Sequence, residues 1–142
     1  MSIVRAAYVN EPNVAVLYAY VDRNEWRYKY ELYDSGKTTE ISIPDKAFLF
    51  SSLTCFNGKT YLGGYVYENQ KNFATQWVDG KIEDVSGGEE YTEIKFLYST
   101  ESNFYQANWY ADGVRTSKNG TILYDFKCGE VFEPKDWCVV ER

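Results

Sequence analysis

The sequence predicts an all-β protein of three four-stranded antiparallel units, and three observations lead to that prediction. Apolar residues alternate with polar ones along most segments, which is the period of a half-buried strand. Residue pairs that tolerate the positive φ angles of tight hairpins separate these segments at short intervals. Similar stretches also recur about every 45 residues, which indicates internal repeats. The turn pairs are Asn57-Gly58, Asp79-Gly80, Gly87-Gly88, Asp112-Gly113 and Asn119-Gly120.

Two segments in the first unit indicate different strand environments. The stretch VAVLYAYV (14–21) is apolar on both faces, so we expect cover on both sides. No long segment has apolar residues at helical spacing, and we expect at most a short helical turn near the C-terminal EPKDW. The stretch WRYKYELY (26–33) alternates, which predicts a half-buried strand. Its buried face is expected to carry Trp26, Tyr28, Tyr30 and Leu32.

Three copies of one unit align by their inner strands and by the turns that follow. The inner strands LYAY, LGGY and QANW end in an aromatic residue at spacings of 45 and 44 (from 20 to 65 and from 65 to 109). We predict units at 1–46, 47–93 and 94–126 of one domain, and a closing segment at 127–142. The aligned residues are Tyr20, Tyr65 and Trp109, the turns Ser35-Gly36-Lys37, Asp79-Gly80-Lys81 and Asn119-Gly120-Thr121, and the segments Glu40-Ile41-Ser42 and Asp84-Val85-Ser86.

The stretch KTYLGGYVYENQKNFATQWVDGKIEDVS resembles bacterial β-propeller repeats of the type Y-x-x-G, a hairpin, A-x-x-W-x-x-G-K. The resemblance covers 47–93 best, and it implies four-stranded blades with a small residue near the ring axis and an aromatic residue between blades. Three blades are fewer than the usual four to eight. Either two chains assemble into a larger ring, or the three units fold as the alternative, a β-trefoil.

Charge and cysteine content restrict the partner and the compartment. Fifteen basic and twenty-one acidic residues give a net charge of −6, which disfavours nucleic acid and anionic membranes and favours a basic protein. No basic segment precedes an apolar run and no stretch approaches about 20 apolar residues, so we expect a cytoplasmic protein. Cys55, Cys128 and Cys138 show no metal-ligand spacing and are expected to be thiols; Cys128 and Cys138 would pair only in an oxidising space.

Catalytic equipment is missing from the sequence. It contains no histidine, which excludes Ser-His-Asp and Cys-His arrangements. No glycine-rich phosphate loop is present either. A pair of carboxylates within the acidic run 83–93 could in principle act as in glycosidases, but a solvated acidic edge is the favoured interpretation. We therefore expect no enzyme activity, no cofactor and no metal.

Three functions are compatible with these features. The first is an acidic inhibitor or immunity-type protein that binds and blocks a basic partner such as a toxin, through Glu83, Asp84, Glu89, Glu90, Tyr91 and Glu93. The second is a carbohydrate-binding lectin with repeated aromatic and acidic sites, although packing in the core is the favoured role of its candidate tryptophans, Trp77 and Trp109. The third is a structural subunit of a homo-oligomer. The sugar-binding candidates are Trp77 with Asp79 and Trp109 with Asp112.

Overall fold

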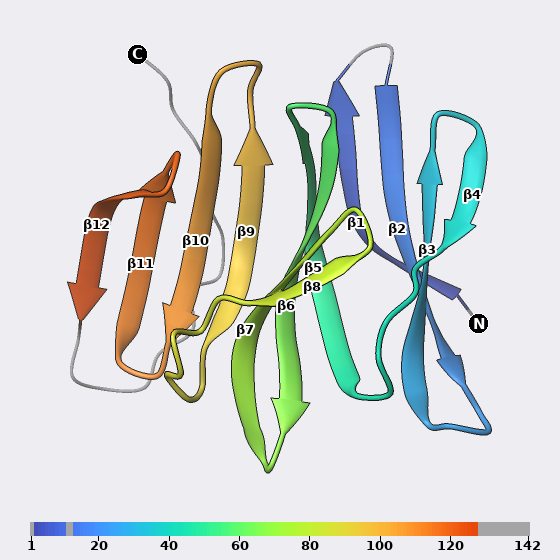
Figure 1. Cartoon of the computed structure of the whole chain (residues 1–142), viewed down its shortest axis with the longest axis horizontal. Helices are drawn as coiled ribbons and strands as arrows, with labels where there is room; N and C mark the ends of the chain where they lie inside the picture. The colour runs from blue at the N-terminus through green and yellow to red at the C-terminus, as the bar shows by residue number, and fades with distance from the viewer. Residues whose placement is uncertain (1, 11–12, 128–142) are drawn as a thin grey trace.

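The computed structural model describes residues 2–10 and 13–127, which form twelve strands in three four-stranded antiparallel sheets (Figure 1). This confirms the predicted all-β class and three four-stranded sheets. The described residues contain no helix, so no helix among them could cross a membrane. The predicted closing segment after residue 127, which includes EPKDW and the cysteines at 128 and 138, lies outside the described residues. The strands are β1 (Ser2–Asn10), β2 (Asn13–Asp22), β3 (Arg27–Asp34), β4 (Lys37–Glu40), β5 (Ala47–Phe56), β6 (Lys59–Glu68), β7 (Lys71–Val78), β8 (Lys81–Asp84), β9 (Glu93–Ser99), β10 (Phe104–Tyr110), β11 (Gly113–Lys118) and β12 (Thr121–Lys127).

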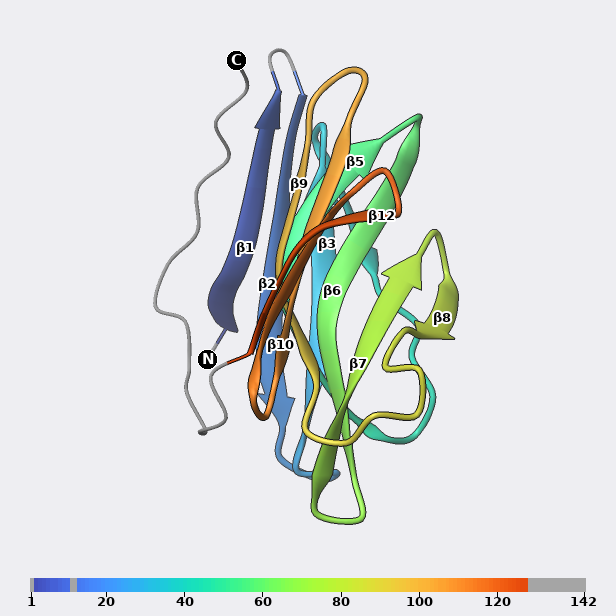
Figure 2. The same ribbon diagram turned by 90° about the vertical axis from the view of Figure 1, so that its left-hand side faces the viewer.

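Each sheet is a meander of consecutive strands: sheet A is β1–β4, sheet B is β5–β8 and sheet C is β9–β12. The sheets are stacked, with B between A and C, and the first strands β1, β5 and β9 run next to one another. In Figure 2, β1 lies on one side of the molecule and β8 on the other. The arrangement consists of separate sheets, as the blade-like interpretation requires.

Sheets A and B enclose the main core, and sheets B and C enclose a smaller one. Leu17, Tyr30, Phe50 and Leu62 are completely buried between A and B. Between B and C, Ile94 packs with Ala74 and Leu97. Alternation along β2 and β6 therefore places successive side chains in different layers, because successive residues of a strand point to opposite faces.

One irregularity marks the same place in every sheet. A β-bulge in the first strand falls at Arg5, Ser51 and Lys95, at spacings of 46 and 44 residues. This register corrects the sequence alignment of the first unit by one position, because Ala19 rather than Tyr20 corresponds to Tyr65. The cause is the β2–β3 connection, which has four residues (23–26) where the β6–β7 connection has two (69–70).

The seam between sheets B and C uses polar contacts at the first strands. The Ser52 hydroxyl accepts a hydrogen bond from the amide of Leu97 at 2.7 Å. The Ser99 hydroxyl donates to the carbonyl of Cys55 at 2.6 Å and lies 2.8 Å from the Thr54 hydroxyl. Ser52 lies beside the bulge at Ser51, and together these contacts satisfy buried polar groups in the seam.

Two expectations for sheet A need correction or qualification. The strand β3 begins at Arg27, so Trp26 lies in the preceding turn and is 82% exposed rather than buried. In β2, Ala15, Leu17 and Ala19 are buried against sheet B as expected. The opposite face of β2 is apolar as well, but its Val14 is 37% exposed, so the described residues cover only one face of this strand fully.

Candidate functional site

Acidic residues concentrate at one end of the molecule, the lower end in Figure 1, which we call the acidic end. It consists of the connections 22–27, 41–46, 68–71, 85–92 and 111–112. These segments contain seven acidic and four basic residues. The acidic residues are Asp22, Glu25, Asp45, Glu68, Glu89, Glu90 and Asp112, and the basic residues are Arg23, Arg27, Lys46 and Lys71.

The opposite end has a different charge balance. Its described turns contain three acidic and four basic residues, so of the two ends only the acidic end has more acidic than basic residues in its described connections. A potential of one sign on one face steers and orients an oppositely charged partner. The residues of the opposite end are Asp34, Asp79 and Glu101, and Lys37, Lys59, Lys81 and Lys118.

Trp26 is the most exposed large apolar residue in the described chain, with 82% of its surface accessible. It has a φ angle of 52°, in the left-handed region that bulky side chains rarely adopt. The turn is fixed by Asp22, whose carbonyl accepts from the Trp26 amide at 2.7 Å and whose carboxylate accepts from the Asn24 amide at 2.8 Å. An exposed indole held in an unfavourable backbone conformation is typical of a binding site rather than of a packing position.

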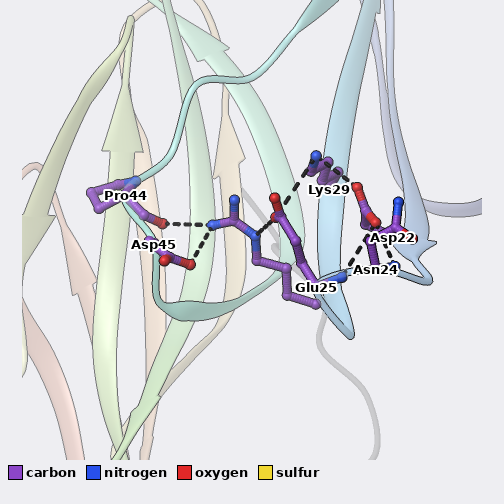
Figure 3. A network of polar contacts seen from close by, with 7 residues as sticks. Asp22, Asn24, Glu25, Lys29, Pro44 and Asp45 are labelled. Carbon is purple, nitrogen blue, oxygen red and sulfur yellow. Dashed lines mark hydrogen bonds and ion pairs between the residues drawn. The ribbon is translucent and has the colours of Figure 1, made fainter.

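Salt bridges brace this turn against neighbouring segments (Figure 3). Lys29 lies 2.7 Å from the Asp22 carboxylate, and this contact is the main cause of the lowered pKa of Asp22 and the raised pKa of Lys29. Arg27 pairs with Glu25 and also reaches Asp45 at 3.1 Å in the connection between sheets A and B. The network holds the base of Trp26 while leaving its ring exposed.

The connection 85–92 contributes a second exposed aromatic residue, Tyr91. It is 45% exposed and, like Trp26, has a positive φ angle, 57°. The next residue, Thr92, fixes the connection to sheet B: its hydroxyl accepts from the Ala74 amide at 2.9 Å and donates to the Glu89 carbonyl at 3.1 Å. Tyr91 is therefore displayed by a well-anchored segment.

The residues of the predicted acidic site do not form one cluster. Glu89, Glu90 and Tyr91 share the exposed connection of the acidic end, where Glu90 pairs with Lys71 at 2.5 Å. The other three belong to strands. Glu83 and Asp84 lie on the short edge strand β8, and Glu93 begins β9 and has a side chain only 12% exposed.

The strand carboxylates already have local partners. Asp84 accepts from the amide and the hydroxyl of Ser86, at 2.8 and 2.6 Å, which makes it part of a turn. Lys81 lies 3.6 Å from Glu83, and Lys95 lies 3.2 Å from Glu93. The six residues are close in sequence, but in the structure three of them lie in an exposed connection and the other three belong to strands.

The sugar-binding candidates lie in four different environments. Trp77 is 8% exposed and packs in the core between sheets A and B, and no partner for its indole nitrogen lies among the described residues. Asp79 accepts from the Thr60 amide at 2.9 Å in a turn. Trp109 lies under the Lys95 ammonium, 6.0 Å from its ring centre, and Asp112 is exposed in the β10–β11 turn.

A groove of about 550 Å³ runs along the first strands of the three sheets. Its walls include Ala7 and Val9 of β1, Ser51 of β5, and Leu97 and Tyr98 of β9. The groove has both apolar and polar walls, and the polar side chains include Lys95, Glu101 and the hydroxyl groups of Ser51 and Ser99. Within the described residues no group of three or more histidine, cysteine or acidic side chains could hold a metal ion.

Comparisons of the chain with protein-family models, curated proteins and solved structures give no match. The site is therefore interpreted from its own residues. Sequence reasoning found Tyr91 and two of its acidic neighbours but missed Trp26, which it assigned to the buried face of a strand. The polar run Asp22 to Glu25 immediately before Trp26 is the signal that favours a turn there.

Proposed function

We propose that this protein is a non-enzymatic binding module of the inhibitor or immunity type, which binds a basic protein through its acidic end. The observation that carries the proposal is Trp26, 82% exposed in a strained turn that ion pairs of Asp22 and Glu25 with Lys29 and Arg27 hold in place. Large aromatic side chains dominate the binding energy of protein interfaces. Tyr91, in the connection between β8 and β9 at the same end, is the second aromatic residue of the proposed surface.

The charge distribution supports a basic partner. The whole chain has a net charge of −6, and the connections of the acidic end contain seven acidic and four basic residues. Asp45, Glu68 and Glu90 have side chains 93%, 45% and 48% exposed, so a partner can reach them although each is paired with a basic side chain of the same end. Electrostatic attraction of this kind raises the association rate and is weakened by salt.

The absence of histidine from the sequence favours a binding role over acid–base catalysis at neutral pH. Carbohydrate binding is the second candidate, but no single observation favours it. Trp77 packs in the core, and a ring must expose one face to stack on a sugar. The proposal therefore gives the aromatic role to Trp26 and Tyr91.

The three sheets are, in this proposal, blades of the β-propeller type. The support is the recurrence of one four-stranded meander with a bulge at the same place in each first strand. In such an arrangement, equivalent connections of the three sheets lie at the same end of the stack. The acidic end contains the β2–β3, β6–β7 and β10–β11 connections, so residues of separate blades share one surface.

The experiment that tests the proposal is affinity capture from native lysate of the source organism at low salt, with elution first by a sugar mixture and then by salt. We expect one basic protein in the salt fraction. Its association with the purified chain is then measured by stopped flow at increasing ionic strength, and the association rate should fall steeply. Release of glycoproteins by sugar alone would contradict the proposal.

Two matched substitutions locate the binding surface. Glu89→Lys and Glu101→Lys change the net charge equally and replace exposed glutamates, but at opposite ends of the molecule. We expect Glu89→Lys to weaken binding about tenfold, the size of losing an attraction and adding a repulsion. Glu101→Lys should leave the affinity within about twofold. Equal effects of both substitutions would rule out the acidic end as the binding surface.

A further inference from the structure

Asn57 and Asn119 are the two asparagines of the sequence that precede a glycine. Asn57-Gly58 forms the turn between β5 and β6, and Asn119-Gly120 forms the turn between β11 and β12. The two backbones are alike, since both asparagines have a φ angle of 50° and the two glycines have φ angles of 72° and 80°. Both asparagines are exposed. The turns are therefore a matched pair that differ in how the asparagine side chain is held.

The Asn119 carboxamide is held at both of its polar atoms. Its Oδ1 accepts a hydrogen bond from the amide of Phe104 at 2.8 Å, and its Nδ2 donates to Oδ1 of Asn103 at 3.0 Å. The corresponding turn of sheet B is built in the same way, because Oδ1 of Asp79 accepts from the amide of Thr60 at 2.9 Å. The side chain at this position thus ties its turn to the second strand of the same sheet.

The Asn57 carboxamide has no such restraint. Within the part of the chain that the structure describes, its side chain makes no hydrogen bond to another residue, and it has no unstated partner. The hairpin is held instead by the strands, which pair Phe56 with Lys59 and Cys55 with Thr60. The next residue, Gly58, has no side chain to keep the carboxamide away from its backbone nitrogen. The side chain of Asn57 can therefore turn toward Gly58 without breaking a contact.

We infer that Asn57 is a site of spontaneous deamidation in the folded protein and that Asn119 is protected from this reaction. The Gly58 amide nitrogen loses its proton to base and forms a bond to Cγ of Asn57. The Cγ–Nδ2 bond breaks, and Nδ2 takes a proton from water and leaves as ammonia, so that a five-membered succinimide ring remains. Water then opens the ring at either carbonyl carbon. The product at this position is aspartate, or isoaspartate when the chain continues through the side-chain carbon.

The difference between the two turns follows from what the carboxamide must give up. Its Cγ atom has to approach the next backbone nitrogen, and in Asn119 this movement breaks the hydrogen bonds to Phe104 and Asn103. The strain of bringing the glycine nitrogen into position is common to both turns, because their backbones match. Loss of two exposed hydrogen bonds corresponds to a rate about tenfold lower at Asn119 than at Asn57.

The reaction would change the charge and the backbone of one hairpin. Either product adds one negative charge to the net charge of −6. The new charge lies at the end opposite the acidic end, whose described turns contain three acidic and four basic residues. Isoaspartate also adds a methylene group to the backbone of a two-residue turn, where turn geometry fixes the register of the strands. This modification needs no partner protein, so the inference is independent of the proposed function.

One sample of the purified full chain gives both rates. The protein is incubated in mildly alkaline buffer, and peptide mapping by mass spectrometry follows conversion at Asn57 and at Asn119. Urea-unfolded chain is the reference, and there the two residues should react at similar rates because glycine follows both. In the folded protein we expect Asn57 to react about tenfold faster than Asn119. Equal rates in the folded protein, a faster reaction at Asn119, or no reaction at Asn57 would overturn the inference.

A pair of substitutions at Asn103 tests the cause of the protection. Asn103→Ala removes the acceptor of the Asn119 Nδ2 atom, so it should raise the rate at Asn119 severalfold and leave the rate at Asn57 unchanged. Asn103→Asp keeps an oxygen acceptor and is the matched control, which should retain the protection. If Asn103→Ala, folded by circular dichroism, left the rate at Asn119 unchanged, the side-chain hydrogen bonds would not be the protecting contacts.

The effect of the extra methylene group is tested against a variant with the same charge. Asn57→Asp has the charge of the deamidated protein and an unaltered backbone. Protein that contains isoaspartate at position 57 should therefore unfold at a lower urea concentration than Asn57→Asp, because β5 and β6 both contribute to the main core. Identical unfolding curves would contradict the expected disturbance of the hairpin register.

Discussion

The hydroxyl of Tyr30 in sheet A is hydrogen-bonded to the backbone of sheet B on both sides of Leu49. It donates to the carbonyl of Phe48 at 2.9 Å and accepts from the amide of Phe50 at 3.0 Å. The Tyr30 ring is fully buried and meets the Phe50 ring edge-on at 5.3 Å between centres. One side chain thus joins two sheets by packing and by hydrogen bonds.

Tyr30→Phe keeps the ring but removes both hydrogen bonds. The amide of Phe50 and the carbonyl of Phe48 would lose a buried partner, so we expect the free energy of unfolding to fall by about 1–3 kcal/mol. Urea unfolding followed by fluorescence measures this change. Tyr33→Phe, three residues further along β3 and on the outer face of sheet A, is the control and should change stability by less than about 0.5 kcal/mol. Equal effects of the two substitutions would mean that the buried hydrogen bonds of the Tyr30 hydroxyl contribute no more to the free energy of unfolding than an exposed tyrosine hydroxyl does.

Stability should also fall at high pH because of Tyr30. Burial raises the pKa of Tyr30 from 10.0 to about 12. Between these values the unfolded state loses the phenolic proton while the native state keeps it, so the unfolded state is favoured as pH rises. The contribution is complete below pH 10, and its loss amounts to roughly 2–3 kcal/mol by pH 12. Urea unfolding between pH 8 and 11.5 should show a steeper decline for the wild type than for Tyr30→Phe, and parallel curves would refute the assignment.

Gly63 and Gly64 should respond differently to alanine. A Cβ atom on Gly64 would lie 1.8 Å from the backbone oxygen of Leu49, which cannot move without breaking the sheet. We expect Gly64→Ala to prevent folding. A Cβ on Gly63 would lie 2.6 Å from the Cγ2 methyl of Ile94, a side-chain contact that can relax, so Gly63→Ala should cost about 1–3 kcal/mol.

A second substitution checks the cause of the Gly63 effect. Ile94→Leu removes the Cγ2 methyl, so it should recover part of the stability lost in Gly63→Ala when the two are combined. Thermal unfolding of the single and double variants measures the interaction between the sites. Strict additivity would show that the crowding between sheets B and C is not the reason for the loss.

Trp26 should reduce stability while serving binding. Glycine adopts a φ of 52° without strain, so Trp26→Gly is expected to exceed Trp26→Ala in stability by about 0.5–1 kcal/mol. Alanine is the matched comparison because it also removes the indole but keeps the Cβ atom. Both variants should lose affinity for the captured partner about equally. A less stable glycine variant would show that the turn is not strained at this residue.

The sequence pattern was sufficient for the sheets because alternation and turn chemistry act locally. Tyr28, Tyr30 and Leu32 face the core as predicted, and Asn57-Gly58 and Asp79-Gly80 adopt the positive φ angles expected of them. Trp26 escaped this reasoning because an alternating pattern does not mark where a strand starts. The start of β3 is set by the turn that Asp22 holds through its hydrogen bonds to the amides of Asn24 and Trp26.

The acidic site could be predicted only in part, because ion pairs join residues far apart in sequence. Lys71 meets Glu90 across nineteen positions, and Arg27 meets Asp45 across the connection between two sheets. The run of acids at 83–93 therefore contains both exposed and paired carboxylates. The sequence also could not show how far each face of β2 is covered, since a strand that is apolar on both faces predicts cover but not its source.

The meander topology also determines the order in which the molecule can form during synthesis. Every hydrogen-bonded strand pair joins neighbours in sequence, so each sheet closes only short loops and assembles quickly. Sheet A is complete once Glu40 has emerged, before any residue of sheet B can cover Leu17 or Tyr30. A nascent chain therefore exposes the apolar face of sheet A that later packs against sheet B. The short edge strand β4, exposed at all four positions and charged at both ends, would protect this intermediate from pairing with other chains.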